Sequence, residues 1–228
     1  MTELSTIQAA GEPGLRDRKK ARRRDEIIAA AKDLFARQGI DATTMADIAA
    51  AVEISTPTVF NYFGSKDGIL IAMITEGTME AREEDRALHW REGVDLAGLI
   101  TGLFVRVSTR TLEIAGKRVW RYAEAAAIRH PDADLSRQYA AVSAALIDVV
   151  ATFFAGLSLT TRAGTNCAPD WAAATFHDLW MPCFIRLITD EAETLADHEA
   201  ALRTRFEPLV TLIFTEDCAT HPRQKAPK

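Results

Sequence analysis

Cysteine is scarce in this sequence, and its few copies lack the spacings in which it usually serves. The 228 residues include Cys167, Cys183 and Cys218, with no CxxC pair among them. An odd number of widely separated cysteines argues against a disulfide framework and against a zinc site. We therefore expect a cytoplasmic protein without a bound metal.

Long hydrophobic runs are also missing. The first residues, MTELSTIQAAGEPG, do not show the basic-then-apolar pattern of a secretory signal. The most apolar stretch, 140–157, is interrupted by Asp148, which favours a core helix over a membrane span. The sequence predicts no membrane partner.

Catalytic and cofactor motifs are absent as well. We find no Ser-His-Asp arrangement, no metal-ligand spacing, no glycine-rich phosphate loop and no paired carboxylates. The residues His89, His130, His177 and His198 lie on separate segments without a partner at a useful spacing. The sequence predicts neither an enzyme nor a cofactor.

Charge is distributed unevenly along the chain, whose formal net charge is −5. Residues 16–24, RDRKKARRR, contain seven basic residues and one acidic residue. Residues 1–70 contain ten of the 27 basic and ten of the 32 acidic residues, which leaves 17 and 22 for the rest. Because nucleic-acid affinity depends on local phosphate contacts, the overall acidity does not exclude it. The basic run suits DNA phosphates or a minor groove, or it is a solubilising tail; we favour DNA contact.

The most informative segment is 43–66, TTMADIAAAVEISTPTVFNYFGSK, which has the layout of a helix-turn-helix. Thr44 can cap one short helix in a capping-box arrangement. Ser55 can cap the next, with Pro57 in its first turn, and Gly64 ends it. The second helix of such a motif enters the major groove of DNA.

That second helix has an outward side of small and hydrogen-bonding residues, while Val59 and Phe63 point to the core. Methyl and ring carbons suit thymine methyl groups, and hydroxyl and amide groups can bond base edges or phosphates. Thr44 and Lys66 lie at the starts of helices, where backbone N–H groups favour contact with DNA phosphates, and Lys66 adds a positive charge. Phe60 could pack on DNA or belong to the core. The candidate DNA-binding residues are Thr44, Thr56, Pro57, Thr58, Phe60, Asn61, Tyr62 and Lys66.

The remaining periodic segments all predict helices, and no strand pattern or internal repeat stands out. The expected class is all-α with about nine helices. They cover roughly 18–38, 44–52, 55–63, 65–86, 96–107, 117–129, 135–157, 169–189 and 194–215. We divide the chain into a disordered tail (1–15), a three-helix DNA-binding unit (16–66), a helical domain (67–217) and a flexible tail (218–228).

At these residues the chain resembles the tetracycline-repressor (TetR) family of bacterial regulators. The segments that carry the resemblance are IIAAAKDLFARQGI (27–40), TTMADIAAAVEIS (43–55) and TPTVFNYFGSKDGIL (56–70). Beyond residue 90 only the number and length of the helices agree. The resemblance implies a homodimer that reads a palindromic operator on double-stranded DNA. It also implies a C-terminal ligand-binding and dimerisation domain, and usually repression relieved by a small-molecule effector.

Four positions depart from the usual pattern of the family. Glu53 stands where the turn glycine is usual, so we expect backbone strain there. Ile40 replaces the aromatic residue that usually follows Gly39, a benign core change. Phe60 and Asn61 replace a frequent Tyr and His, and Phe60 has no hydroxyl for a phosphate. The phosphate contacts and the operator cannot be transferred whole from the family.

The helical domain is rich in large aromatic residues, each of which is by itself more typical of a core. As a set they indicate an apolar pocket. Asp148 and His177 are candidate polar anchors, although a hydrogen-bonded core carboxylate and a surface histidine are the simpler interpretations. The candidate ligand-binding residues are Phe104, Trp120, Asp148, Phe153, His177 and Trp180.

The last two helices carry apolar stripes that suit either a four-helix dimer interface or the core of one chain. The stripes are Phe176, Leu179, Phe184, Leu187 and Leu202, Phe206, Leu209, Ile213. The family resemblance favours the interface. We expect a homodimeric repressor released by a small, largely apolar ligand. The alternative is a nucleoid or division-associated DNA-binding protein of the same fold without an effector.

Overall fold

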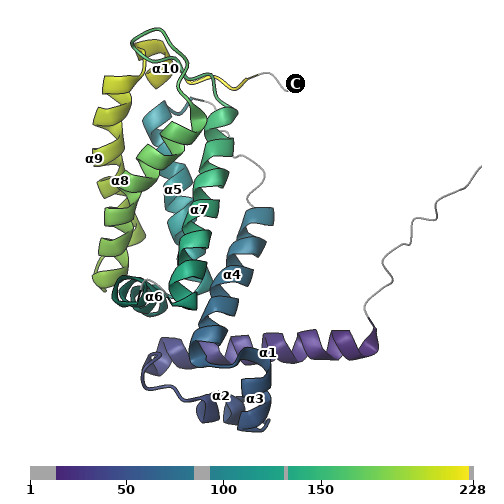
Figure 1. Ribbon diagram of the computed structural model, residues 1–228. Coiled ribbons are helices and arrows are strands. Elements are labelled where there is room, and N and C mark those ends of the chain that lie inside the picture. Colours follow the sequence, from purple (N-terminus) through teal and green to yellow (C-terminus); the bar gives the residue numbers. More distant parts are fainter. Residues whose placement is uncertain (1–13, 85–92, 131–132, 226–228) are drawn as a thin grey trace, which may run out of the picture.

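The computed structural model describes residues 14–84, 93–130 and 133–225, and these are almost entirely helical (Figure 1). The helices are α1 (Leu15–Gln38), α2 (Met45–Ala51), α3 (Thr56–Phe63), α4 (Lys66–Glu84), α5 (Leu96–Ile114), α6 (Lys117–Arg129), α7 (Asp134–Ala155), α8 (Pro169–Thr189), α9 (Leu195–Ile213) and α10 (Glu216–Thr220). The described ranges contain isolated β-bridges but no strand. The predicted all-α class is confirmed. The predicted disordered tail lies almost wholly outside the described residues.

Helices α1 to α3 form a small unit at one end of the molecule, where α1 crosses the foot of α4 (Figure 1). Their apolar sides recur at helical spacing and meet in a shared core. The core includes Ile27, Ala31, Phe35, Ile40, Ile48, Val59 and Ile69. Ile40 is only 3% exposed, as expected for an aliphatic replacement of the usual aromatic residue.

The turn between α2 and α3 contains the strained residue that the sequence predicts. Glu53 has a φ of +54°, in the left-handed region that disfavours any residue with a Cβ. Gly64 ends α3 with a φ of +71°. Ser55 precedes α3 as predicted, but its hydroxyl makes no cap bond to the backbone. Its Oγ lies 2.8 Å from the Oγ1 of Thr58 instead.

The C-terminal part is a bundle of α5, α7, α8 and α9, with α6 at the end nearest α1 (Figure 1). Phenylalanine rings fill its centre. The Phe206 ring lies 5.5 Å from that of Phe104 and 5.2 Å from that of Phe176, between centroids. Such tilted and edge-on pairs add to the stabilisation from burial.

The apolar stripes of α8 and α9 belong mainly to this core, so their assignment to a dimer interface was wrong. The stripe residues Phe176, Phe184, Leu187, Leu202 and Phe206 are at most 1% exposed within a single chain. Side chains already buried in one chain cannot bury more area against a second. A partner would have to meet other residues of these helices.

The residues after α9 pack against the bundle, where we expected a flexible tail from residue 218. The hydroxyl of Thr215 caps the short helix α10, in which Cys218 is buried. Backbone hydrogen bonds then join Ser158 to Arg223 (2.9 Å) and Lys225 to Gly156 (2.8 Å). These bonds fix the end of α7 and the loop before α8.

Among the described residues, α7 is the one helix long and apolar enough to pass a composition test for a membrane span. Core helices of soluble proteins pass the same test. Here α7 packs against α4, α6 and α8 in the bundle (Figure 1).

Candidate DNA interface and ligand cavity

Helix α3 separates a core side from an outward side. Val59 is fully buried, and the Phe63 ring packs against the core, 5.2 Å below the guanidinium carbon of Arg24. Pro57 and Asn61 are exposed. Phe60 is 47% exposed, so it does not belong to the core. The outward side therefore combines the predicted Pro57 and Asn61 with the ring of Phe60.

A groove joins this outward side to the basic half of α1. Its volume is about 840 Å³. It is lined by Arg16, Asp17, Lys19, Lys20, Arg22, Arg23, Glu26, Thr58 and Tyr62. The basic run therefore lies on a helix, not in a tail. The fold sets its positive charge beside two residues of the candidate recognition helix, where DNA phosphates would neutralise it.

Two of the groove arginines pair with the same carboxylate. Arg22 Nε and Arg23 Nη1 lie 3.0 and 2.8 Å from the Glu26 oxygens. Exposed ion pairs of this kind contribute about 0–1 kcal/mol. Because they are weak, a phosphate can take over either guanidinium at little cost.

Thr44 caps α2 as predicted. Its Oγ1 accepts from the N–H of Asp47 (3.1 Å), and the Asp47 carboxylate accepts from the N–H of Thr44 (2.8 Å). The backbone and hydroxyl hydrogen bonds from Thr44 lower the pKa of Asp47. The Thr44 side chain is exposed, but its hydroxyl is already engaged in this capping box.

Lys66 has a role that the sequence did not indicate. Its ammonium donates to the carbonyl oxygens of Ile40 (2.7 Å) and Asp41 (3.4 Å). The first turn of α4 is thereby tied to the segment between α1 and α2. The contact concerns the internal structure of the unit rather than its outward side.

The comparisons with known proteins agree with this geometry. Residues 27–73 match the family described as "Bacterial regulatory proteins, tetR family". The resemblance to the tetR family that the sequence predicts is thus confirmed for the N-terminal unit. The chain is 42% identical over 71 residues to the HTH-type transcriptional regulator TcmR of Streptomyces glaucescens, which is 31% of either chain. The chain thus matches less than a third of that relative's length.

Solved structures of the tetR family share the whole fold. A putative tetR-family regulator from Mesorhizobium loti superposes with a TM-score of 0.65 and 21% identity. That match covers 86% of this chain and 99% of the other. The repressor FadR of Thermus thermophilus, solved with lauroyl-CoA, gives 0.60 and 24%, covering 90% and 99%. At these identities the likeness shows the fold alone.

In this TetR-family fold, an apolar cavity lies between α4 and α8. Its volume is about 90 Å³. The lining residues come from five helices: Thr78, Val107, Arg110, Thr111, Ile114, Trp120, Tyr139, Val142, Ser143, Leu146, Val149, Trp180, Met181 and Phe184. Aromatic rings make one wall, where Trp180 stacks on Phe184 at 4.8 Å and Trp120 lies 6.1 Å from Tyr139.

Of the six predicted ligand-binding residues, two line this cavity, Trp120 and Trp180. Phe104 and Phe153 do not line it; their rings pack into the core. Asp148 is exposed on α7, so it is neither a pocket anchor nor a core carboxylate. His177 is buried rather than on the surface, and it lies beside Trp180 without lining the cavity.

The sequence missed several cavity residues, of which Arg110 and Tyr139 are the most polar. Arg110 and Ile114 continue the stripe of Val107 along α5 at spacings of three and four residues, a signal that could have identified them. The Tyr139 hydroxyl donates to the carboxylate of Glu124 on α6. Burial raises the pKa of Glu124 and of Tyr139. This pair joins α6 to α7 at the cavity wall.

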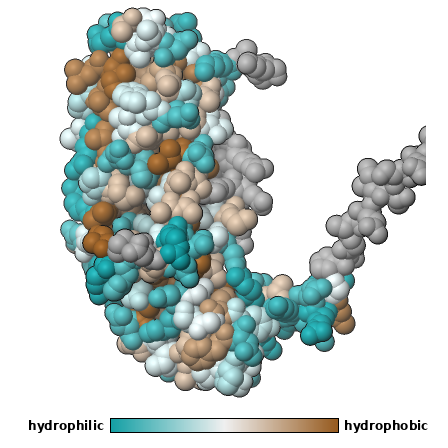
Figure 2. Space-filling view, in the orientation of Figure 1, coloured by the Kyte–Doolittle hydropathy of each residue, from teal (hydrophilic) through white to brown (hydrophobic). Residues whose placement is uncertain are grey.

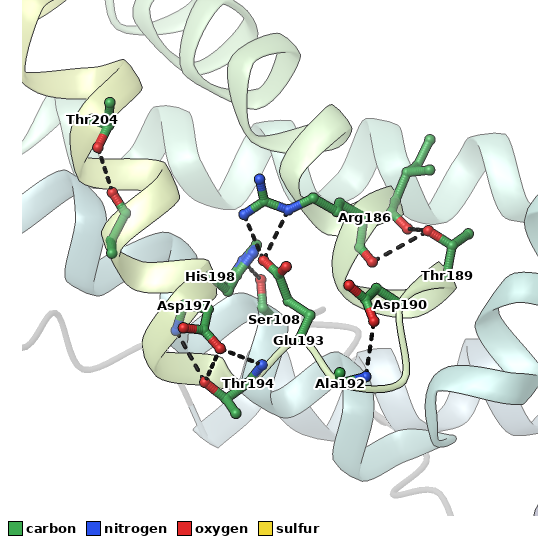
Figure 3. A network of polar contacts seen from close by, with 12 residues as sticks. Ser108, Arg186, Thr189, Asp190, Ala192, Glu193, Thr194, Asp197, His198 and Thr204 are labelled. Carbon is green, nitrogen blue, oxygen red and sulfur yellow. Dashed lines mark hydrogen bonds and ion pairs between the residues drawn. The ribbon is translucent and has the colours of Figure 1, made fainter.

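A buried polar cluster holds the N–H edge of the Trp180 indole. The indole Nε1 donates to Ser108 Oγ (2.9 Å), which also lies 2.8 Å from His198 Nε2. Figure 3 shows His198 of α9 directed at Ser108 of α5, beside the ion pair of Arg186 and Glu193. Burial lowers the pKa of His198. The cluster fixes the orientation of a cavity-lining ring from outside the cavity.

Proposed function

We propose that the chain is a homodimeric repressor that binds a palindromic DNA operator and leaves it when a small, largely apolar ligand binds. It would act in the cytoplasm, on the nucleoid. The observation that carries the proposal is the shared groove of α1 and α3, in which basic residues adjoin Thr58 and Tyr62. The match of residues 27–73 to the tetR family supports the homodimer, and the apolar cavity supports release by a ligand.

On DNA, α3 would enter the major groove with Thr56, Pro57, Thr58, Asn61 and Tyr62 near the bases. Phe60 lies in the C-terminal half of α3, where it is exposed, and would pack on the DNA backbone. The basic residues of α1 would contact phosphates. At Thr44, the backbone N–H groups at the start of α2 would contact a phosphate. The primary role of Lys66, in contrast, is to tie α4 to the Ile40 carbonyl.

Several contacts join the cavity to the DNA-binding unit. Lys32 of α1 donates to the carbonyl of Glu113 on α5 (2.5 Å). Arg118 of α6 donates to the carbonyl of Arg37 on α1 (3.2 Å). Both α5 and α6 also line the cavity. A ligand that displaces these helices would therefore move α1 and α3, and a differential affinity of a few kcal/mol suffices for release.

A partner chain would meet the outward faces of α8 and α9. Exposed apolar residues lie on both helices: Trp171 (49%) and Ile185 (37%) on α8, Leu195 (37%) and Leu212 (73%) on α9. Figure 2 shows apolar surface along the edge of the molecule formed by these helices. In the dimer the two α3 helices would sit about one DNA turn apart, roughly 34–36 Å.

The test of DNA reading uses the palindrome in the intergenic sequence beside the gene. We expect Thr58→Ala and Asn61→Ala each to weaken operator binding in gel shifts by about 1–3 kcal/mol, roughly 5- to 150-fold. Thr152→Ala, the same kind of change at an exposed site on α7, should leave binding unchanged. Parental affinity and selectivity in both α3 variants would show that α3 does not read the operator.

The dimer is tested by sedimentation. Ile185→Glu and Leu212→Glu would each place a charge on the outward face, so we expect the dimer to dissociate at micromolar concentration. Ile128→Glu, at a 78% exposed position on α6, is the matched control and should remain dimeric. Dimers of unchanged stability in both interface variants would rule out this face.

A further inference from the structure

We propose that the ligand of the α4–α8 cavity is an uncharged molecule with an apolar body and a hydroxyl group, and that this hydroxyl donates a hydrogen bond to Nε2 of His177. This inference rests on the proposed release by a ligand and adds to it a binding residue and the chemical class of the ligand. It is carried by the buried imidazole of His177, which lies on the same face of α8 as residues of the cavity lining.

His177 is a polar residue inside the apolar bundle. It is 7% exposed, and neither of its ring nitrogens makes a hydrogen bond within the part of the chain that the structure describes. A carboxylate oxygen of the exposed Asp178 lies 3.7 Å from Nδ1, which is too long for a hydrogen bond. Because buried polar groups are nearly always paired, these nitrogens lack a partner that a bound molecule would supply.

The state of the imidazole decides which chemical group can pair with it. Burial lowers the pKa of His177, so the ring is neutral at pH 7, with one N–H donor and one acceptor nitrogen. The carboxylate beside Nδ1 favours the proton on that nitrogen, which leaves Nε2 as the acceptor. A hydroxyl can donate to Nε2, whereas an ether, a ketone or a carboxylate cannot. An ammonium can donate as well, but its burial against apolar walls costs more free energy than that of a hydroxyl.

His177 shares a face of α8 with residues that line the cavity. It precedes Trp180, Met181 and Phe184 by three, four and seven residues, which is the spacing of one helix face. Its ring centroid lies 5.4 Å from that of Trp180. The imidazole is therefore the next side chain on this face, one turn beyond the lining residues.

The facing helix α7 places the end of the cavity at the same level. Helices α7 and α8 run in opposite directions (Figure 1), and the rings of Phe154 and Phe176 stack at 5.6 Å. That contact sets His177 near the level of Phe153, one turn after Val149, the last α7 residue of the described lining. On both helices the cavity thus stops one turn, ~5.4 Å, short of His177.

Met181 is the side chain that a ligand would displace to reach the imidazole. Helical side chains lean toward the N-terminus of their helix, so Met181 lies over the turn that carries His177. It lines the cavity, is half-buried and is unbranched, so it can change its conformation at little cost. The cavity volume of about 90 Å³ is below the ~150 Å³ that accommodates benzene in an engineered cavity. A ligand must therefore displace a side chain, and displacement of Met181 would connect the cavity to Nε2.

The aromatic wall suits an apolar body and does not compete for the hydroxyl. The indole N–H groups of Trp120 and Trp180 already donate to protein oxygens, at 2.6 and 2.9 Å. Along α8, the seven-residue step from His177 to Phe184 spans about 10 Å. A body of two fused rings, or an alkyl chain of similar length, would extend along this wall with its hydroxyl at the His177 end.

Matched probes test the class with the full chain in the absence of DNA. We would compare 2-naphthol with 2-methoxynaphthalene, and 1-octanol with its isomer heptyl methyl ether, by quenching of tryptophan fluorescence and by calorimetry. The two members of each pair have similar bodies, but only the hydroxyl compound can donate a hydrogen bond. We expect it to bind at least about tenfold more tightly than its ether, which corresponds to ~1.4 kcal/mol. Such a preference in either pair supports the class and shows which body fits.

His177→Phe keeps a ring of similar size but removes the acceptor. It should abolish the preference, while the affinity for the ether changes less than about twofold. His130→Phe, the same change at an exposed position after α6, is the control and should retain the preference. Equal affinity within both pairs, a preference that survives His177→Phe, an equal loss in both variants, or no binding of any probe would overturn the proposal.

A measurement on the unchanged chain covers the case in which His177→Phe does not fold. In protein labelled with ¹⁵N-histidine, the Nε2 resonance of His177 is identified by its absence from the spectrum of His177→Gln. We expect the hydroxyl compounds alone to shift it in the direction of an accepted hydrogen bond, and the same shift with the ethers would count against the site. Operator binding by the ligand-free protein is a separate measurement, so its failure would instead count against the proposed function.

Discussion

The N-terminal unit and the C-terminal bundle differ in how their functional residues relate to their cores. In the first, Val59 and Phe63 hold α3 in place, and the candidate DNA-binding residues are those left outside. In the second, rings such as Trp120 and Trp180 are at most 3% exposed and line the cavity as well. A change at the DNA face should therefore leave the fold intact, whereas a change at the cavity alters packing too.

The largest expected effect comes from the bundle core. Phe206→Ala removes a fully buried ring in contact with two others, so we expect a loss of about 3–5 kcal/mol in the free energy of unfolding. Chemical denaturation followed by circular dichroism and by tryptophan fluorescence measures it. Ile128→Ala, on the surface of α6, should change stability by less than about 0.5 kcal/mol. A small loss in Phe206→Ala would contradict the assignment of this stripe to the core.

The contact between α4 and α5, which joins the two regions, is tested at Gly77 of α4. A Cβ there would lie 2.6 Å from Cγ2 of Ile114, a residue of the cavity wall. We expect Gly77→Ala to destabilise the protein by about 1–3 kcal/mol through overpacking. In an Ile114→Ala background the same change should be neutral or stabilising, because the clash is gone and alanine favours helix. Gly102→Ala on α5, with open space around it, is the control. Equal effects in both backgrounds would refute the tight contact.

The pH dependence of stability should arise in the bundle. Burial lowers the pKa of His177 and His198, so the unfolded chain takes up protons at higher pH than the folded chain does. Their stabilising contribution is complete above the ordinary pKa of about 6.5 and is lost as the pH falls toward the folded-state values. The slope is at most about 1.4 kcal/mol per pH unit for each histidine. His177→Gln should flatten the curve between pH 7 and 5, and the exposed His130→Gln should not.

The smallest expected effect is the loss of stability on removal of a helix cap, which can be compared at two equivalent positions. Thr44–Asp47 and Thr194–Asp197 form the same capping box at the starts of α2 and α9. Thr44→Ala and Thr194→Ala should each cost about 1 kcal/mol of stability, because each leaves a helix N–H unsatisfied. In gel shifts at a temperature where both variants are folded, Thr44→Ala alone should weaken operator binding. Equal operator affinities would restrict Thr44 to capping.

Local chemistry made the N-terminal unit predictable. The Thr44 cap, the Glu53 turn and the burial of Val59 all depend on residues within a few positions of one another. The role of Lys66 escaped prediction because its partner, the Ile40 carbonyl, lies 26 residues away in sequence. The basic run was placed in the DNA-binding unit, with a solubilising tail as the alternative, and it lies on a helix that begins at Leu15 rather than at about Arg18.

In the bundle, periodicity predicted the positions of the helices but not what each apolar side contacts. A stripe such as Phe176 and Phe184 has the same pattern whether it meets its own chain or a partner. Likewise, Phe104 and Trp180 are both buried aromatic residues. The packing of five helices leaves the cavity beside Trp180, whereas Phe104 does not line it, which the sequence pattern does not reveal. Asp148 was misplaced for the same reason, since an apolar helix has an exposed side that the pattern does not identify.

Helix α4 extends through both regions, and because it is long, a small tilt at one end displaces the other end by several ångströms. Its 19 residues span about 28 Å at ~1.5 Å per residue. A tilt of about 6° at the cavity end would shift the other end by ~3 Å. In the proposed homodimer, the two symmetry-related α4 helices would change the separation of the α3 helices by ~6 Å. That is close to the rise of two base pairs, at about 3.4 Å each. In the proposed dimer, a tilt of a few degrees would thus be enough to move the two α3 helices out of register with the operator.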